Sequence, residues 1–482
     1  MTDLPPAADP QTAVIDFLAR PTSYGLRDGE VEQIETHCSI VFLAADRAYK
    51  LKRAIRYASL DYTTEELRRR ACESELLLNR RTAPEIYLGV RSIDRDANGA
   101  LGFDGPGPAL DHVVVMRRFA QSALFDHLVE TGKLTPDLMQ ALGQSIARFH
   151  AAAEATSVFG GSDAARCVIA DNNRELALVA STLDGAAVGI LGNRARIALD
   201  DVAALLDQRR EDGSVRRCHG DLRLANICLY NDRPTLFDCI EFSEEIGCID
   251  VLYDLAFLLM DLHLCGRGDL GNVVFNAYLD HAHETDGLRA MPLFLSLRAA
   301  TRSYALAGGA HRRANPRQAA HLQALAQRHI DAAIGFLAPH RPMLVMLGGG
   351  DDRQRTETAV MLAALISPAP GARVLHLGSS GEATWREAFE VLAAGCSVLL
   401  EGLFAENAEQ NAIAALPLPV QLFSFWLGPL PVALNDRIWR SLDNSEGVLA
   451  AVASAAPLVS AADTQSRVLY PEPELTPINA TP

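Results

Sequence analysis

The chain lacks the features that mark membrane, secreted and zinc-binding proteins. No apolar run reaches the roughly 20 residues of a membrane-spanning helix, since the apolar residues 255–260 lie between Asp254 and Asp261. The first residues, Met-Thr-Asp-Leu-Pro-Pro, have neither the basic nor the apolar segment of a signal peptide. The nine cysteines include no Cys-x-x-Cys pair and no histidine at zinc spacing. We therefore expect a cytoplasmic protein with reduced cysteines and no membrane partner.

Basic residues are also scarce relative to acidic ones. The chain has 44 Lys and Arg against 60 Asp and Glu, a formal net charge of −16. This excess of negative charge disfavours nucleic acids as partners. The content of 49% hydrophobic and 22% charged residues is ordinary for a globular enzyme. The length of 482 residues predicts about three units, and we find no internal repeats.

Hydrophobic periodicity and breaker residues divide the chain into five segments. We expect a flexible lead-in, a strand-rich N-lobe with one helix (65–80), a mainly α C-lobe, an α/β domain and a disordered tail. Their predicted bounds are 1–24, 25–118, 119–338, 343–461 and 462–482. The lead-in carries a short helix (13–19), and residues 338–342, Ala-Pro-His-Arg-Pro, form the linker to the α/β domain.

Within the two later domains the pattern predicts individual elements. In the C-lobe we expect helices at 136–153, 195–209, 251–264, 293–306 and 316–336, and a loop at 155–175, which is rich in Gly, Ser and Asp. In the α/β domain we expect strands at 343–347 and 397–400 and a helix at 357–366.

One short motif says most about chemistry. His219-Gly-Asp221 is followed five residues later by Asn226, and Asp238 ends the next apolar run. Phosphoryl transfer needs a carboxylate that deprotonates the attacking hydroxyl and oxygen ligands that hold Mg²⁺ at the triphosphate. The spacing is that of a kinase catalytic loop. We predict Asp221 as the base and Asn226 and Asp238 as Mg²⁺ ligands; the alternative is an Asp-rich turn.

A predicted hairpin brings these groups together. Residues 227–230 form a strand, 231–234 a turn and 235–237 the returning strand, which places Asp238 near the loop that carries Asp221.

These residues resemble the aminoglycoside phosphotransferase-like kinases. The resemblance lies in His-Gly-Asp, in Phe-Asp-Cys-Ile-Glu-Phe around Asp238 and in Asp250-Val-Leu-Tyr-Asp254-Leu-Ala, and it covers about residues 25–340. It implies a protein-kinase-like two-lobed fold, ATP and Mg²⁺ as cofactors and a small-molecule substrate. The sequence looks closest to a bacterial group that joins such a domain to a P-loop ATPase-like domain. The expected fold is therefore α+β and α/β multidomain.

The resemblance also suggests the nucleotide-binding residues. Lys50 and Lys52 lie two apart on a predicted strand and face the same side. One of them is expected to bind the phosphates, with Lys50 favoured; solvated edge lysines are the alternative. Glu75 is expected to hold that lysine, with Glu73 as the rival. Met116 is expected in the segment that holds adenine.

Several neighbouring positions have two interpretations. Residues 37–40 replace the glycine-rich loop, and Arg223 stands where relatives often carry a histidine. Asp254 either holds the catalytic loop or simply begins a helix. The acidic stretch 241–245 either faces an amine-bearing substrate or is a solvated loop. Arg298 and Arg302 either bind an anionic substrate group or pair with nearby acids.

The α/β domain begins with a degenerate phosphate loop. A strand and Gly348-Gly-Gly lead into a helix, but read from Gly349 the phosphate-loop pattern has Gln354 for its second glycine and Arg355 for its lysine, and keeps only Thr356. A side chain at the second glycine obstructs phosphate, and the acids at 351 and 352 repel it. Glu401 is a weak candidate for the acid of a second nucleotide motif. We expect a P-loop-like domain that binds no nucleotide tightly and packs against the kinase-like domain.

The leading prediction is an ATP-dependent phosphotransferase acting on a hydroxyl of a small molecule. The alternatives are a nucleotide-binding regulatory or scaffold protein and a protein kinase; the latter is disfavoured because no Ala-Pro-Glu segment follows the predicted catalytic loop. The substrate is left open.

Overall fold

The computed structural model describes residues 11–469, except 58, 314, 367, 379–380, 405–419, 432–438 and 443–446. The chain divides into two compact units, which are described separately. The first comprises Met1–Leu134, Phe149–Phe159 and Val215–Asp254, and the second comprises Thr135–Arg148, Gly160–Ser214 and Leu255–Pro482. The two units differ from the two lobes expected from the sequence, because the predicted catalytic segment groups with the N-lobe. The expected lobe bounds stay predictions.

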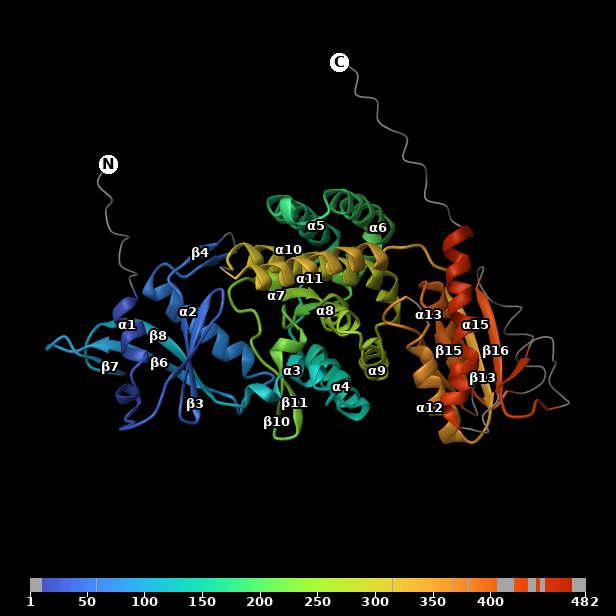
Figure 1. The fold of residues 1–482 in the computed structure, drawn as a ribbon, viewed down its shortest axis with the longest axis horizontal. Coiled ribbons are helices and arrows are strands. Elements are labelled where there is room, and N and C mark those ends of the chain that lie inside the picture. Colours follow the sequence, from blue (N-terminus) through green and yellow to red (C-terminus); the bar gives the residue numbers. More distant parts are fainter. Residues whose placement is uncertain are drawn as a thin grey trace, which may run out of the picture. The chain divides into compact units, whose positions relative to one another are not determined.

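A six-stranded antiparallel sheet forms the N-lobe of the first unit (Figure 1). Its order is β1-β2-β3-β8-β6-β7, and the strands are β1 (Glu32–Glu35), β2 (Ser39–Ala44), β3 (Arg47–Lys52), β6 (Tyr87–Arg95), β7 (Leu101–Phe103) and β8 (Ala109–Arg117). Helix α2 (Glu65–Asn79) begins at Thr64, whose Oγ1 accepts a hydrogen bond from the Leu67 amide at 3.2 Å. Its Cys72 packs with Leu43 and Val114 of the sheet. The single predicted helix of this lobe is therefore present.

The lead-in is packed where the structure describes it, which corrects the expectation of a flexible segment. Helix α1 (Thr12–Leu18) and the 3-10 turn η1 (Pro21–Tyr24) lie against the sheet, with Val14 and Leu18 buried in a core that includes Phe42 and Leu51. The sequence feature that indicates this packing is the spacing of the apolar residues 14 and 18, because such spacing buries one face of even a short helix. Residues 1–10 lie outside the described part.

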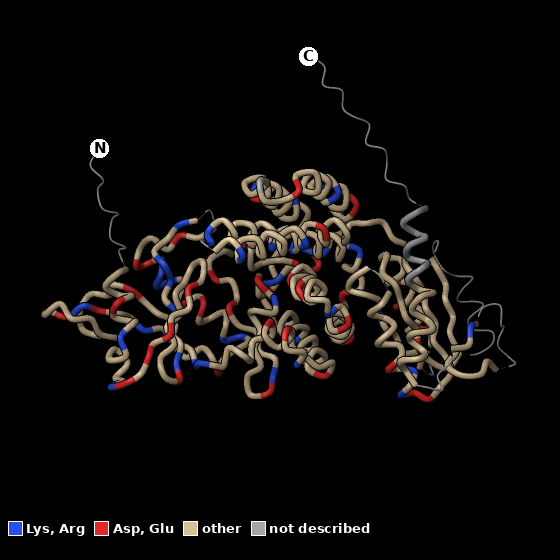
Figure 2. Tube along the Cα trace, viewed as in Figure 1, with Lys and Arg blue, Asp and Glu red and all other residues tan. Residues whose placement is uncertain are grey.

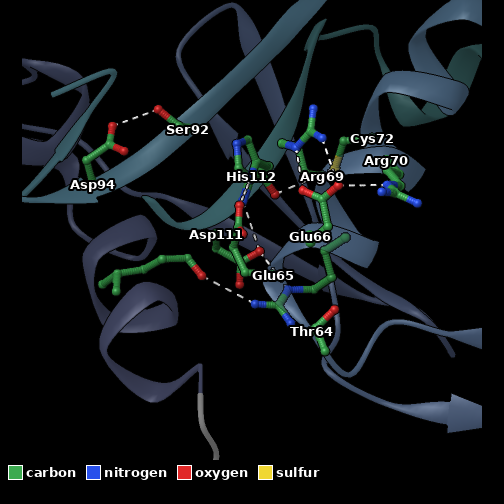
Figure 3. Close-up of polar contacts among 12 residues, drawn as sticks. Thr64, Glu65, Glu66, Arg69, Arg70, Cys72, Ser92, Asp94, Asp111 and His112 are labelled. Atoms are coloured by element: carbon green, nitrogen blue, oxygen red, sulfur yellow. Dashed lines mark hydrogen bonds and ion pairs between the residues drawn. The ribbon is translucent and has the colours of Figure 1, made fainter. Parts of the chain in front are cut away.

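A buried polar network connects the lead-in, α2 and β8. Asp111 accepts hydrogen bonds from Arg68 Nε at 2.8 Å and from Gln11 Nε2 at 2.6 Å. In Figure 3 the neighbouring His112 lies beside Glu65, and its Nδ1 is 3.0 Å from Glu65 Oε1. Since Asp111 is fully buried, its two donors offset the cost of removing the carboxylate from water.

The rest of the first unit is the segment around the predicted catalytic loop. It contains β9 (Val215–Arg217), η4 (Leu224–Asn226), β10 (Ile227–Tyr230), β11 (Arg233–Leu236), α7 (Glu244–Gly247) and β12 (Cys248–Asp250). The hairpin β10–β11 is as predicted, except that its turn has two residues and Pro234 lies in the strand. Asn231 and Asp232 adopt φ of 49° and 58°, the left-handed conformation that such two-residue turns require. Smaller elements of this unit are β4 (Arg56–Tyr57), β5 (Leu60–Asp61), η2 (Gln121–Ala123) and α3 (Phe125–Glu130).

Helices dominate the second unit outside its C-terminal part. They are most of α4 (Pro136–Ala152), α5 (Gly161–Leu178), α6 (Gly185–Glu211), most of α8 (Val251–Leu264), α9 (Gly268–Leu279), α10 (Met291–His311) and α11 (Pro316–Phe336), with η3 (Ala180–Thr182) and η5 (Thr285–Ala290). Among the described residues, no helix has both the length and the apolarity that crossing a membrane requires. Figure 2 shows that acidic and basic residues are interspersed along the chain.

The predicted loop at 155–175 is wrong, because α5 begins at Gly161. The Gly, Ser and Asp residues of this stretch suggested a loop, but Ala165, Ile169 and Leu176 recur at helical spacing and are buried. Helix α6 also begins earlier than predicted, since Asp184 caps it by accepting from the Ala186 amide at 2.9 Å.

A five-stranded sheet forms the C-terminal domain, residues 343–469 (orange to red in Figure 1). Its order is β14-β15-β13-β16-β17 with all pairs parallel, and its strands are β13 (Met343–Gly349), β14 (Arg373–Leu377), β15 (Val398–Gly402), β16 (Gln421–Leu427) and β17 (Trp439–Leu442). The helices are α12 (Asp352–Ala363), α13 (Glu382–Ala393) and α15 (Val448–Leu469). The tail expected from 462 is therefore helical up to 469, and the rest of it lies outside the described residues.

Within the second unit, the C-terminal domain is joined to helix α9 by buried polar contacts. Asn272 is 1% exposed and donates to the carbonyls of Pro370 at 2.9 Å and Ala372 at 3.0 Å. Arg373 pairs with Asp280 at 2.6 Å. These contacts satisfy backbone groups at the start of β14, which otherwise would be buried without partners.

Candidate active site

The loop His219-Gly-Asp221 has a backbone that requires glycine at its centre. Gly220 has φ of 85°, and a Cβ there would lie 2.9 Å from Cγ1 of Ile240 and 3.1 Å from the carbonyl oxygen of Ile246. The Nε2 of His219 lies 2.9 Å from the carbonyl oxygen of Phe237, so it donates to that oxygen. Burial lowers the pKa of His219, which favours this neutral tautomer. The histidine thus ties the loop to the end of β11.

Asp254 holds the same loop from the first turn of α8. Its Oδ2 accepts from the His219 amide and its Oδ1 from the Gly220 amide, each at 2.9 Å. His150 Nε2 lies 3.1 Å from Oδ2, and both side chains are buried. Of the two interpretations of Asp254, the geometry supports the one in which its carboxylate holds the predicted catalytic loop. His150, Cys218 and Asp254 are close enough to share a metal, but the oxygens of Asp254 already accept from the loop amides.

Asp221 and Asn226 lie in direct contact. Asn226 Nδ2 donates to Asp221 Oδ2 at 2.7 Å and to the Asp221 carbonyl at 2.9 Å. Arg223 Nε donates to the same Oδ2 at 3.1 Å. Asp221 is partly exposed, whereas Asn226 is buried. The carboxylate of Asp221 is therefore held in one orientation by two donors from its own loop.

Asp238 follows β11 in a left-handed conformation, with φ of 64°. A residue other than glycine is uncommon there, and such positions concentrate at functional sites. Its amide donates to Tyr87 Oη at 3.1 Å, and its carboxylate pairs with Lys50. Burial alone would raise the pKa of Asp238, but the ammonium of Lys50 lowers it to about 2. Asp238 is therefore a carboxylate at neutral pH.

Lys50 and Lys52 form a chain of ion pairs with three acids. Lys50 Nζ lies 2.8 Å from Glu75 Oε1, while Lys52 pairs with Glu75 Oε2 and with Glu241. The fully buried Glu75 is thus the α2 residue that meets the lysines. Glu73 is exposed on the same helix and pairs with Arg69. The interpretation of the acidic stretch as a solvated loop is wrong for Glu241, whose carboxylate is buried against Lys52. The interpretation that the stretch faces a substrate stays a prediction.

A cavity of about 470 Å³ connects these groups in the first unit. Its polar wall includes Lys50, Asp221, Asn226 and Asp238. Its apolar wall includes Ile34, Val41, Leu43, Ala48, Met116, Leu124 and Phe237. Met116 lies near the end of β8 at the predicted adenine position, and residues 36–39 of the β1–β2 turn line the cavity where a glycine-rich loop would lie. The volume falls in the range of small-molecule sites, which measure roughly 300–1,000 Å³.

Two further residues, Asn79 at the end of α2 and Arg81 just after it, contact the predicted catalytic segment, and these contacts were not expected from the sequence. Asn79 Oδ1 accepts from the Cys239 amide at 2.8 Å. Arg81 donates to the carbonyls of Arg217 at 2.6 Å and Cys218 at 3.3 Å. Asn79 ends the sequence Glu-Leu-Leu-Leu-Asn that begins at Glu75, but nothing local distinguishes Arg81 from a surface arginine. Such contacts join distant segments and have no sequence period.

The scarcity of lysine in the sequence could have strengthened the prediction that Lys50 and Lys52 belong to the site. Among the 44 Lys and Arg residues, only three are lysines, at 50, 52 and 133. Two of the three lie in the cavity wall. A chain that uses arginine nearly everywhere else keeps the compact ammonium group where phosphate contact is predicted.

In the C-terminal domain, the segment predicted to be a degenerate phosphate loop is filled by its own side chains. Arg355 is 1% exposed; its Nε lies 2.7 Å from Glu401 Oε2, and it also pairs with Asp352. Asp351 caps α12 by accepting from the Gln354 amide at 2.8 Å, which is where an anion at a helix N-terminus would bind. A Cβ at Gly349 would lie 2.5 Å from the Leu427 carbonyl, so β16 closes on the loop.

Comparison with known proteins gives one family match. Residues 74–294, slightly less than half of the chain, match the family model APH, described as the phosphotransferase enzyme family. Uncharacterized proteins of Mycobacterium bovis and Mycobacterium tuberculosis are 30% identical over 273 residues, which is 56% of this chain and 53% of theirs. The chain thus spans about half the length of these curated relatives. The matched region contains Glu75 and the whole predicted catalytic segment.

Two solved structures align over most of their length. A choline/ethanolamine kinase family protein from Mesorhizobium loti is 16% identical with a TM-score of 0.40, and the alignment covers 68% of this chain and 99% of that one. The amicoumacin kinase hAmiN, solved with AMP-PNP, Ca²⁺ and amicoumacin, is 13% identical with a TM-score of 0.40, covering 67% and 94%.

Proposed function

We propose that the chain is an ATP-dependent phosphotransferase that transfers the γ-phosphoryl group to a hydroxyl of a small molecule. The observation that carries the proposal is the convergence of Asp221, Asn226, Asp238 and Lys50 on one cavity. The match of residues 74–294 to a phosphotransferase family supports it.

The donor set at the cavity fits Mg²⁺. Asp238 offers an ionised carboxylate and Asn226 an amide oxygen, and Mg²⁺ prefers oxygen ligands of this kind. Bound there, Mg²⁺ would neutralise charge on the β- and γ-phosphates. Lys50 would hold the phosphates, with Glu75 fixing its ammonium. Met116 would contact the adenine ring.

Asp221 would act on the acceptor. It orients the hydroxyl and accepts its proton while the hydroxyl oxygen bonds to the γ-phosphorus and the bond to the β-phosphate oxygen breaks. The products are the phosphorylated acceptor and ADP. Asn226 and Arg223 keep the carboxylate in one orientation, which lowers the cost of positioning it.

One observation favours the alternative of a nucleotide-binding regulatory protein. Lys50 pairs with Asp238, so the predicted phosphate ligand and the predicted metal ligand engage each other. This ion pair must open before Mg·ATP binds. Opening of the pair by the nucleotide is enough for a sensor, which needs no phosphoryl transfer. Turnover separates the two functions.

An ADP-release assay over a panel of acceptors tests the proposal. The panel should hold amino sugars, choline-like alcohols, neutral sugars and nucleosides, each with Mg·ATP. Acceptor-dependent ADP release supports the phosphotransferase. Saturable Mg·ATP binding without ADP release from any acceptor supports the regulatory alternative.

For the C-terminal domain we propose a P-loop-like fold without nucleotide chemistry. The parallel sheet and the strand–loop–helix of β13 and α12 support the fold. The Arg355–Glu401 pair supports the absence of nucleotide chemistry. Arg355 occupies the position of the phosphate-loop lysine, but its guanidinium is paired with Glu401. The contacts of Asn272 support packing against the helical part of the second unit. A cytoplasmic location is proposed because all nine cysteines are free thiols.

A further inference from the structure

Two buried ion pairs connect β3 to the rest of the candidate site. One joins Lys50 to Glu75 and the other joins Lys52 to Glu241. The side chains of Lys52 and Glu241 are only 2% and 5% exposed. Both residues line the cavity but expose almost none of their side chains, so the contacts of the pair are mainly with the protein itself.

Burying a lysine and a glutamate is costly unless further partners satisfy them. Tyr62 supplies one, since its hydroxyl donates to Glu241 Oε1 at 2.5 Å. Glu75 supplies another, since its Oε2 pairs with Lys52. Burial opposes the charged forms, yet the acids raise the pKa of Lys52 and the ammonium lowers the pKa of Glu241. Both groups are therefore charged, and the network is fully connected.

The pair joins three segments that are far apart in sequence. Lys52 ends β3, Glu75 lies on α2, and Glu241 follows Asp238 by three residues. When Lys50 leaves Asp238 for a phosphate, Lys52 still neutralises Glu75 and still holds Glu241. The Lys52–Glu241 pair thus keeps this arrangement while the Lys50–Asp238 pair opens during binding.

We propose that Lys52, Glu241 and Tyr62 are positioning residues that hold Glu75 and the Asp238 segment in the arrangement that binds Mg·ATP. This inference rests on the proposed function of the same site. It assigns the phosphate contact to Lys50 and gives Lys52 a different role. It also assigns a role to the one acid of the stretch 241–245 that is buried.

The test compares nucleotide affinity of folded variants of the full chain. Glu241→Gln removes the charge, and Tyr62→Phe removes one hydrogen bond while keeping the ring. Calorimetry with Mg·AMP-PNP should show affinity lowered about tenfold or more for Glu241→Gln and by a smaller factor for Tyr62→Phe. The matched controls are Glu66→Gln and Arg70→Met, which break an exposed pair on α2 and should keep parental affinity.

The outcomes separate this inference from the proposed function. If the parent binds Mg·AMP-PNP and both variants bind it equally well, with only a lower melting temperature, the pair is merely structural and the inference is overturned. If the parent itself fails to bind, the proposed function is wrong. Should Glu241→Gln fail to fold, Tyr62→Phe decides, because its ring still fills the same space.

Discussion

The ammonium of Lys50 lies 2.8 Å from Glu75 and also pairs with Asp238, so one cation is shared between helix α2 and the predicted metal-binding segment. Burial would lower the pKa of Lys50, but Asp238 and Glu75 raise it well above its ordinary value. Lys50 therefore stays charged in the resting site. When Mg·ATP binds, we expect the ammonium of Lys50 to exchange one of its two carboxylate partners for a phosphate.

Lys50→Met should lower Mg·ATP-dependent turnover by about 10²–10³, because a positioned charge facing the transferred group is lost. The fold should survive, since Glu75 keeps its contact with Lys52. Steady-state kinetics on the best acceptor measures the effect, with the exposed Lys133→Met as the matched control. Equal loss in both variants would contradict the assignment.

Asp238→Ala should weaken Mg·ATP binding, because it deletes a proposed metal ligand. The measurement is the rise in melting temperature that ATP produces with and without Mg²⁺. The parent should show a Mg²⁺-dependent rise and the variant a smaller one. An unchanged rise would place the metal elsewhere.

His329 of α11 should make the stability of its unit depend on pH. Burial, together with Arg302 and Arg328, lowers its pKa from 6.5 to about 4 despite the hydrogen bond to the Leu325 carbonyl. The unfolded chain therefore binds this proton at higher pH than the folded chain, so stability falls as pH drops from about 6.5 to about 4. The change amounts to about 3 kcal/mol. Urea unfolding at pH 7 and pH 5 should show a smaller difference in His329→Gln than in the parent, whereas the exposed His321→Gln should behave like the parent.

The C-terminal domain should add no nucleotide site. Calorimetry of the full chain with Mg·ATP should give one equivalent, and Asp238→Ala should reduce this to weak binding. Mg·GTP tests the same domain with a second nucleotide. A tight site that survives in Asp238→Ala would show that the loop at Gly349 accepts phosphate despite the Arg355–Glu401 pair.

Local patterns predicted the elements well where one face is apolar. Helices 251–264 and 316–336 have the predicted bounds, and β10 was predicted to the residue. Helix α5 was missed because the Gly, Ser and Asp residues of 155–175 favour turns locally, whereas burial of the apolar face of the helix decides the outcome.

The candidate site was predictable only where its residues share one motif. Asp221, Asn226 and Asp238 lie within one loop and hairpin, so their spacing placed them together. The partners of Lys52 and the contacts of Arg81 depend on the packing of distant segments, which no local pattern encodes. Glu75 and Glu73 are two residues apart on a helix, and only the tertiary structure shows which one is buried.

The central claim is that Asp221 is the base of a phosphoryl transfer, and Asp221→Asn tests it most directly. The substitution keeps size and polarity but removes the proton acceptor. With the acceptor that gives the fastest ADP release, turnover should fall by about 10²–10⁴ while Mg·ATP affinity stays near that of the parent. Equal turnover by the variant and the parent would contradict the account.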